Sequence, residues 1–284
     1  MLRVACCATA ISIVVTTSSV GVAAEGAKDA PKLDVRVPDA RVQAWFWSFP
    51  QGRPERQTRD RKRSDRKKKK KRVSKRFLLF SGSDLWREGN FLYGGMLWAP
   101  SGLDRDSLVV KLITTRGYYR YRSGTLGNAS VVGALYATSV MPGVRFTRGG
   151  VTAFVFAGLD YQVHVLSRDD PGNDIRGRHS GVRIAADLWY QPTPVTMLAV
   201  SATLTSIDQA YAMRTAYGWR VLDRFWLGPE AVVYGASNYQ QLRVGAHLTG
   251  LDFLWLEWQA AFGYAADDDG NRGVYVRLGT SDRW

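Results

Sequence analysis

From Phe77 onwards, apolar and polar residues alternate along short runs of the chain. In 150–166, Val155 and Leu159 share one face, whereas Asp160 and His164 lie on the other. A period of two is typical of β-strands, and turns rich in Gly, Asp, Asn and Pro separate the runs. The pattern predicts about twelve strands, at 77–86, 91–99, 107–122, 130–146, 150–166, 178–191, 195–206, 210–222, 225–236, 239–250, 253–266 and 273–282.

The composition of the two strand faces indicates which face meets lipid. After Arg76 the chain contains a single lysine, Lys111, whereas the outer surface of a soluble barrel is normally rich in Lys and Glu. The polar face instead mixes Arg, Asp, Glu, Gln and Gly, which suits an enclosed lumen. Most runs reach the length that a tilted strand needs to cross a bilayer. We expect an all-β fold, an antiparallel transmembrane β-barrel over 77–284, with a soluble barrel as the alternative.

The predicted registers turn a set of charged side chains into the lumen. Either these side chains carry function, or they form a salt-bridge network that fills the barrel, because twelve strands lie between filled small barrels and open porins. The run 130–146 has apolar residues on both faces and gives no clear register. The proposed lumen-lining residues are Arg116, Arg120, Arg183, Asp187, Arg214, Arg220, Arg243, His247, Glu257 and Arg277, with Arg122 on the same predicted face.

The N-terminal part of the chain has a different texture. Residues 1–24 read as a signal peptide, with Arg3 before an apolar stretch and small residues before Glu25. Residues 25–76 form a low-complexity arm, and 53–76 carries 15 Lys or Arg against three acids. Behind a signal peptide this arm would not meet nucleic acid, so we expect a solvated periplasmic tether before an outer-membrane barrel.

The sequence offers little catalytic chemistry. Both cysteines lie in 1–24, and the three histidines show no zinc-binding spacing. The turn at 267–271 lacks the ligand spacing of a calcium loop. A lipid hydrolase using His179, Ser180 and Asp174 is the serious enzyme alternative, and it needs a nucleophile within reach of its base. We therefore expect no enzyme activity, no cofactor and no metal.

Several strand and turn segments resemble the BcsS family of cellulose-biosynthesis proteins. They include Phe80-Ser-Gly-Ser-Asp-Leu-Trp-Arg87, Phe156-Ala-Gly-Leu-Asp160, Asp187-Leu-Trp-Tyr-Gln-Pro-Thr-Pro194 and Leu227-Gly-Pro-Glu230. The resemblance covers roughly 77–280 and implies a cell-envelope protein linked to cellulose production, with no catalytic residues to carry over. The basic arm is not part of it.

Together these features predict an outer-membrane barrel that exports cellulose or anchors the secretion machinery, with membrane lipid, cellulose and other secretion proteins as partners. A general porin and, less favoured, a lipid hydrolase are the alternatives. We also expect that reversing the charges of Arg214, Arg220 and Arg243 together alters export and leaves the barrel assembled.

Overall fold

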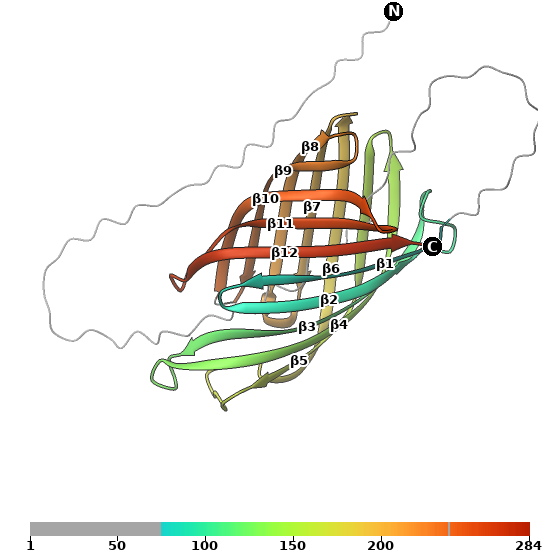
Figure 1. Cartoon of the computed structure of the whole chain (residues 1–284). Helices are drawn as coiled ribbons and strands as arrows, with labels where there is room; N and C mark the ends of the chain where they lie inside the picture. The colour runs from blue at the N-terminus through green and yellow to red at the C-terminus, as the bar shows by residue number, and fades with distance from the viewer. Residues whose placement is uncertain (1–74, 238) are drawn as a thin grey trace, which may run out of the picture. The chain divides into compact units, whose positions relative to one another are not determined.

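The computed structural model describes residues 75–237 and 239–284, which form a closed antiparallel β-barrel (Figure 1). The predicted signal peptide at 1–24 and nearly all of the predicted basic arm at 25–76 lie outside the described residues. A short 3-10 segment, η2 (Ile207–Gln209), links two strands. The strands are β1 (Phe77–Trp86), β2 (Gly89–Trp98), β3 (Ser107–Ser123), β4 (Ala129–Arg148), β5 (Val151–Leu166), β6 (Gly177–Thr193), β7 (Thr196–Thr205), β8 (Tyr211–Val221), β9 (Phe225–Ala236), β10 (Tyr239–Phe253), β11 (Leu256–Asp267) and β12 (Arg272–Arg283).

Each strand pairs with its neighbours in sequence, and β1 pairs with β12 to close the sheet. At this seam Gly82 lies opposite Gly279, and Asp84 lies opposite Arg277. Closure gives every strand a hydrogen-bonding partner on both sides, which is the condition for strands to stand in hydrocarbon. The predicted all-β, twelve-stranded antiparallel barrel is therefore confirmed.

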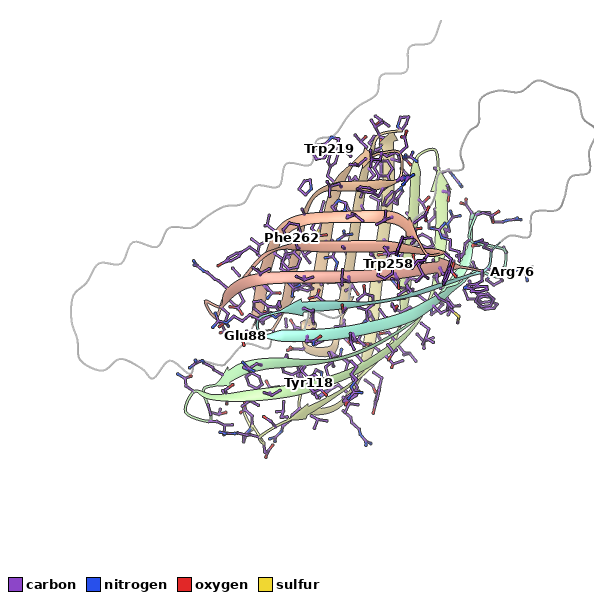
Figure 2. The ribbon with its side chains drawn as sticks, in the orientation of Figure 1. Arg76, Glu88, Tyr118, Trp219, Trp258 and Phe262 are labelled. Atoms are coloured by element: carbon purple, nitrogen blue, oxygen red, sulfur yellow. The ribbon has the colours of Figure 1, made fainter. Side chains whose placement is uncertain are left out.

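Along each strand, successive side chains point alternately to the outer and the inner face of the barrel wall. In β5, Val155 and Leu159 are exposed, whereas Phe156 and Asp160 are buried inside. Figure 2 labels Tyr118, Trp219 and Phe262, three side chains that are exposed on the outer face of the wall. The outer wall is thus apolar and aromatic over most of its surface.

The β10–β11 connection differs from the sequence prediction. The predicted turn lay near 251–252, but β10 continues to Phe253, and Leu254 and Trp255 make the turn with positive φ angles of 47° and 60°. A β-bulge shifts the register between Thr249 and Leu251. The extra residue breaks the period of two, so the alternation alone placed the turn too early.

The strands differ in length around the wall. β1 and β2 have 10 residues each, whereas β3 has 17 and β4 has 20. One end of the barrel carries Phe77, Trp284 and the connections after β2, β4, β6, β8 and β10, and we call it the termini end. The other end carries the connections after β1, β3, β5, β7, β9 and β11, and we call it the loop end. No helix in the described ranges is long and apolar enough to cross a membrane.

Candidate functional site in the barrel interior

Glu230 on β9 lies at the centre of the strongest charge cluster in the interior. Its carboxylate accepts two hydrogen bonds from Arg277 on β12, at 2.8 and 2.6 Å. Arg214 on β8 donates through Nε at 2.9 Å, and the Tyr275 hydroxyl donates at 2.9 Å. All of these are buried, so two arginines share one carboxylate away from water. Forked guanidinium contacts of this kind fix both distance and orientation.

Arg243 on β10 forms a second cluster across the closing seam. Its Nη1 lies 2.8 Å from Asp84 Oδ1 on β1, and its Nε donates to Gln241 at 2.8 Å. The guanidinium also lies 4.9 Å from the ring centre of Tyr234 and 5.1 Å from that of Tyr275. Aromatic faces attract a desolvated cation, so rings and carboxylate together hold this charge.

Asp160 on β5 organises a third cluster on the opposite part of the wall. Its two oxygens accept hydrogen bonds from Ser139 at 2.8 Å and Thr205 at 2.9 Å, and Arg183 lies 3.0 Å away. Gln162 links Asp160 to His164. The hydrogen bonds and the Arg183 ion pair therefore connect β4, β5, β6 and β7 from the inside.

Lys111 on β3 and Asp187 on β6 form a separate buried pair at 3.1 Å. The Lys111 ammonium also lies 5.0 Å from the ring centre of Phe156. The two strands are not neighbours in the sheet, so this pair crosses the interior.

Apolar side chains pack between the charge clusters. One cluster of mutually contacting buried residues joins Phe80 on β1, Phe91 on β2, Phe154 on β5 and Tyr234 on β9. The charged side chains are also shielded from solvent, since those of Arg243 and Asp84 are 0% exposed. A water-filled channel at this level would leave these groups exposed, so the interior is packed with side chains.

The predicted lumen-lining residues divide into three groups by position. Six lie on the inward face and are buried: Arg183, Asp187, Arg214, Arg243, His247 and Arg277. Arg220 and Glu257 also follow the inward register but lie near the termini end and are only half-buried. The remaining residues belong to β3, and their position differs.

The structure corrects the predicted register of β3. Arg116, Arg120 and Arg122 are exposed on its outward face, whereas Tyr119 and Tyr121 point inward and are buried. The prediction assumed that charge marks the lumen. That assumption holds only where the outer face of the wall meets hydrocarbon. Because β2 begins opposite Tyr119, the last part of β3 extends beyond the end of β2.

Sequence reasoning did not assign the acids that neutralise the interior arginines, although the alternation placed Asp160 on the polar face. Asp84, Asp160 and Glu230 are all buried and all pair with arginine. The sequence could have indicated these acids, because each arginine predicted to be buried requires a carboxylate nearby to balance its charge. Searching the inward positions for matching acids would have found Asp84 two residues before Trp86.

At the loop end, the β5–β6 connection folds over the interior. Asp170 is buried there and accepts hydrogen bonds from Tyr121 at 2.9 Å and from the backbone of Gly172 at 3.1 Å. Burial alone would raise the pKa of Asp170, but hydrogen bonds from Thr125, Ser123 and Tyr121 outweigh it and lower the pKa below its usual value. The loop is thus tied to β3 by an ionised carboxylate.

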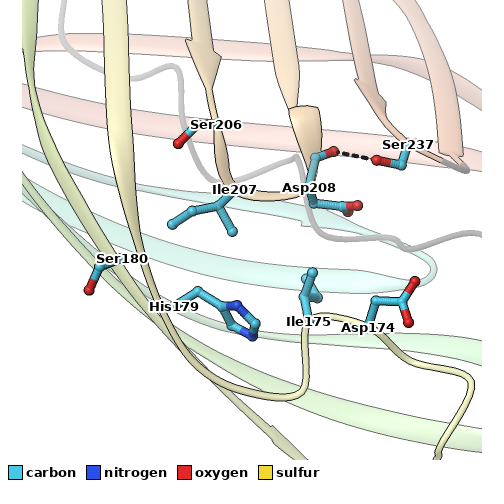
Figure 3. A pocket seen from close by; sticks show the side chains of 8 residues that line it. All are labelled: Asp174, Ile175, His179, Ser180, Ser206, Ile207, Asp208 and Ser237. Carbon is cyan, nitrogen blue, oxygen red and sulfur yellow. Dashed lines mark hydrogen bonds between the residues drawn. The ribbon is translucent and has the colours of Figure 1, made fainter.

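A pocket of about 500 Å³ opens beside this loop (Figure 3). It contains the residues of the hydrolase alternative, Asp174, His179 and Ser180. The Ser180 side chain points away from the His179 ring in Figure 3, as neighbouring residues of a strand must. His179 Nε2 instead lies 3.1 Å from the Arg176 carbonyl oxygen. Figure 3 thus shows no nucleophile–base contact between Ser180 and His179.

Among the described residues, no group of three or more His, Cys, Asp or Glu side chains is arranged to hold a metal ion. The interior therefore offers ion pairs, aromatic boxes and hydroxyls as its chemistry. These groups hold one another and the wall together.

Among known protein families, the family described as cellulose biosynthesis protein BcsS matches this chain over residues 78–283. The match spans β1 to β12. The chain belongs to the BcsS family. None of the curated proteins is similar enough to this BcsS family member to count as a relative.

Solved structures similar to this BcsS family member are β-barrels of low sequence identity. The KdgM porin is 8% identical with a TM-score of 0.40, and the match covers 73% of this chain and 99% of the porin. The translocator domain of the autotransporter NalP from Neisseria meningitidis is 12% identical with a TM-score of 0.42, covering 75% and 90%. A Pseudomonas aeruginosa FadL homologue is 12% identical with a TM-score of 0.40, covering 72% and 73%.

Proposed function

We propose that this BcsS family member is a non-enzymatic outer-membrane β-barrel that assists cellulose secretion by anchoring the secretion machinery. The packed, ion-paired interior is the observation that carries this proposal. A conduit for a glucan chain needs a continuous polar passage, whereas the clusters around Glu230, Arg243 and Asp160 occupy the interior with each other.

Insertion into the outer membrane is supported by the outer wall. Exposed Val, Leu, Ile and Phe side chains cover it, and aromatic residues gather near both ends. Trp98, Phe146, Tyr190 and Trp219 are exposed towards the termini end, and Tyr118, Tyr136, Tyr161 and Tyr264 towards the loop end. Two aromatic girdles flanking an apolar band are typical of transmembrane barrels.

The first test is ion conductance of the purified barrel in planar lipid bilayers. We expect no steady conductance of the size that porins give, because side chains fill the interior. A stable, large conductance would contradict the anchor and support the porin alternative. Release of fatty acid from lipid by the purified protein would support a hydrolase instead.

The second test measures cellulose outside the cell and in the periplasm of a deletion strain and its complemented form. An anchor predicts less cellulose outside without periplasmic build-up, and loss of co-purification between the inner- and outer-membrane parts of the machinery. Periplasmic build-up with an intact machinery would point to a conduit. Unchanged cellulose in both fractions would contradict both roles.

A further inference from the structure

The outward-facing charged side chains of β2 to β6 are all positive. Along β2 to β6, no Asp or Glu occupies an outward position within the strands. Arginine occurs there instead, at Arg116, Arg120 and Arg122 on β3 and at Arg178 near the start of β6. Arg148 at the termini end is also outward, and it forms an ion pair with Asp106. We call Arg116, Arg120 and Arg122 the arginine column.

The tyrosines of the loop-end girdle fix the depth of this column. Tyr136 lies directly opposite Arg116 in the β3–β4 register, and Tyr118 is two residues further along β3. The Arg116 guanidinium lies 5.2 Å from the centre of the Tyr136 ring, and its Nη2 lies 3.5 Å from the Tyr118 hydroxyl. Interfacial tyrosines mark the boundary between hydrocarbon and headgroups. Arg116 is therefore at that boundary, and Arg120 and Arg122 lie beyond it.

The height of the column exceeds an ordinary headgroup layer. Six residues separate Arg116 from Arg122, which is roughly 20 Å along a strand. With the usual tilt of about 40°, this corresponds to roughly 15 Å along the membrane normal. A simple phospholipid headgroup layer is only roughly 5–8 Å thick on each side. The arginine column thus reaches as far from the hydrocarbon as the headgroup of a lipid that carries several sugars.

The residue type in the column selects for an anion with several oxygens. A guanidinium presents a planar fork of donors that matches phosphate, and it binds phosphate more specifically than a lysine does. A neutral glucan offers hydroxyls but no charge to complement three arginines. We propose that the arginine column binds the phosphate groups of a phosphorylated glycolipid in the leaflet around the loop end. This inference rests on the proposed insertion into a membrane and is independent of the role in cellulose secretion.

The direct test uses bisphosphorylated lipid A in detergent micelles as the probe, with binding followed by native mass spectrometry. The test variant replaces Arg116, Arg120 and Arg122 by Gln. We expect its affinity for lipid A to fall roughly tenfold or more, because three charge-assisted contacts are lost. Single substitution of Arg120 by Gln keeps the inference testable if the triple variant does not form a barrel, and it should weaken binding to a smaller extent.

A matched control removes the same number of charges at the termini end. Arg105, Arg148 and Arg224 are exposed there, and replacing all three by Gln should leave lipid A binding unchanged. Two further probes separate the sources of phosphate. Dephosphorylated lipid A should bind the wild-type barrel as weakly as bisphosphorylated lipid A binds the column variant, and inorganic phosphate should not displace the lipid.

Equal binding of lipid A by the wild type and the column variant would overturn the inference. So would equal binding of the phosphorylated and dephosphorylated lipids, or displacement by free phosphate. Insertion of the wild type into phosphatidylcholine vesicles is measured separately. A barrel that inserts but ignores lipid A phosphates contradicts only this inference, whereas a barrel that does not insert contradicts the proposed function.

Discussion

Glu230 places one negative charge between Arg214 and Arg277 in a part of the interior closed to water. Such a carboxylate does not add much stability over an apolar packing, but its removal leaves two buried cations facing each other. The cluster is therefore a point at which a single substitution has a large effect.

Replacing Glu230 by Gln should lower the free energy of unfolding by about 3–5 kcal/mol, because uncompensated buried charge is costly. Urea unfolding of the barrel in vesicles, followed by tryptophan fluorescence, measures this change. Asp223→Asn removes a carboxylate that is 92% exposed and 3.8 Å from Arg220, and it should change stability little. Equal stability of the Glu230 and Asp223 variants would refute the energetic role of the cluster.

The same geometry argues against the expectation that reversing the charges of Arg214, Arg220 and Arg243 together leaves the barrel assembled. An acid at Arg214 would face Glu230, and an acid at Arg243 would face Asp84, and all four positions are buried from solvent. Only Arg220, with its side chain 28% exposed, lies where a reversed charge can be solvated.

Asp269 in the β11–β12 turn gives the barrel a pH-dependent element outside the membrane. The residue is exposed by surface area, yet partial desolvation of its carboxyl group, and then the charges of Asp267 and Asp268, raise its pKa to about 6. A raised pKa in the folded state means that ionisation costs stability. This cost is fully present above pH 6 and disappears as the pH falls from about 6 towards the unfolded value of 3.8.

Asp269→Asn should therefore raise the urea midpoint in mildly alkaline buffer, and the gain should shrink progressively below about pH 6. Unfolding curves of the variant and the wild type across this pH window measure the effect. Asp223→Asn, in a different turn, is the control. A gain that does not depend on pH would show that the substitution acts by another route.

At the scale of elements, β1 and β12 can approach because small residues line the seam. A Cβ atom at Gly82 would lie 2.1 Å from the Tyr93 hydroxyl and 2.3 Å from the Leu278 carbonyl oxygen. The tyrosine can rotate, but the carbonyl belongs to the β12 backbone and cannot move without opening the pairing.

Gly82→Ala should therefore destabilise the closed barrel by about 1–3 kcal/mol, the usual cost of overpacking. The readout is the fraction of protein that keeps its compact, heat-modifiable mobility on gels after graded heating. Gly94→Ala on β2 is the matched control, since its nearest atom would be 3.7 Å away. If both variants behave alike, the close approach at the seam does not limit closure.

The strands were predictable because hydrocarbon outside and polar groups inside impose a period of two. β1 and β9 even begin and end where the alternation predicts. In two strands the period of two did not identify the inward face, for physical reasons. In β4, Val131 and Leu135 pack inside while Val132 and Tyr136 face outward, so both faces are apolar. In β3, the outward face leaves the hydrocarbon and becomes charged at Arg120.

The interior site was harder to predict than the strands. Which arginine pairs with which acid depends on how far strands lie apart across the barrel, and Arg243 and Asp84 are 159 residues apart. Alternation gives the face of each residue but not its partner across the lumen.

At the scale of the whole molecule, the Asp84–Arg243 pair couples charge neutralisation to closure. The two residues lie on β1 and β10, so the contact forms only when the first strand reaches the last ones. Until then Arg243 is a cation without its carboxylate. The closing step therefore gives the Arg243 cation its carboxylate partner, so that neither charge is left unpaired inside the barrel.

Asp84→Asn should slow the appearance of the closed form in vesicles on the order of tenfold, if half of the lost pair energy acts in the transition state. A time course of the heat-modifiable form after dilution from urea measures this rate. Asp104→Asn in the β2–β3 loop is the exposed control. An unchanged rate for the Asp84 variant would mean that the pair forms after the rate-limiting step.

The filled interior also bears on how many copies a cell can carry. Every open pore is a leak for small solutes, and its abundance has to be balanced against the permeability barrier. A barrel whose lumen is occupied by its own arginines, acids and aromatic rings adds no such leak. If the protein anchors the secretion machinery as proposed, its copy number can rise without making the outer membrane more permeable.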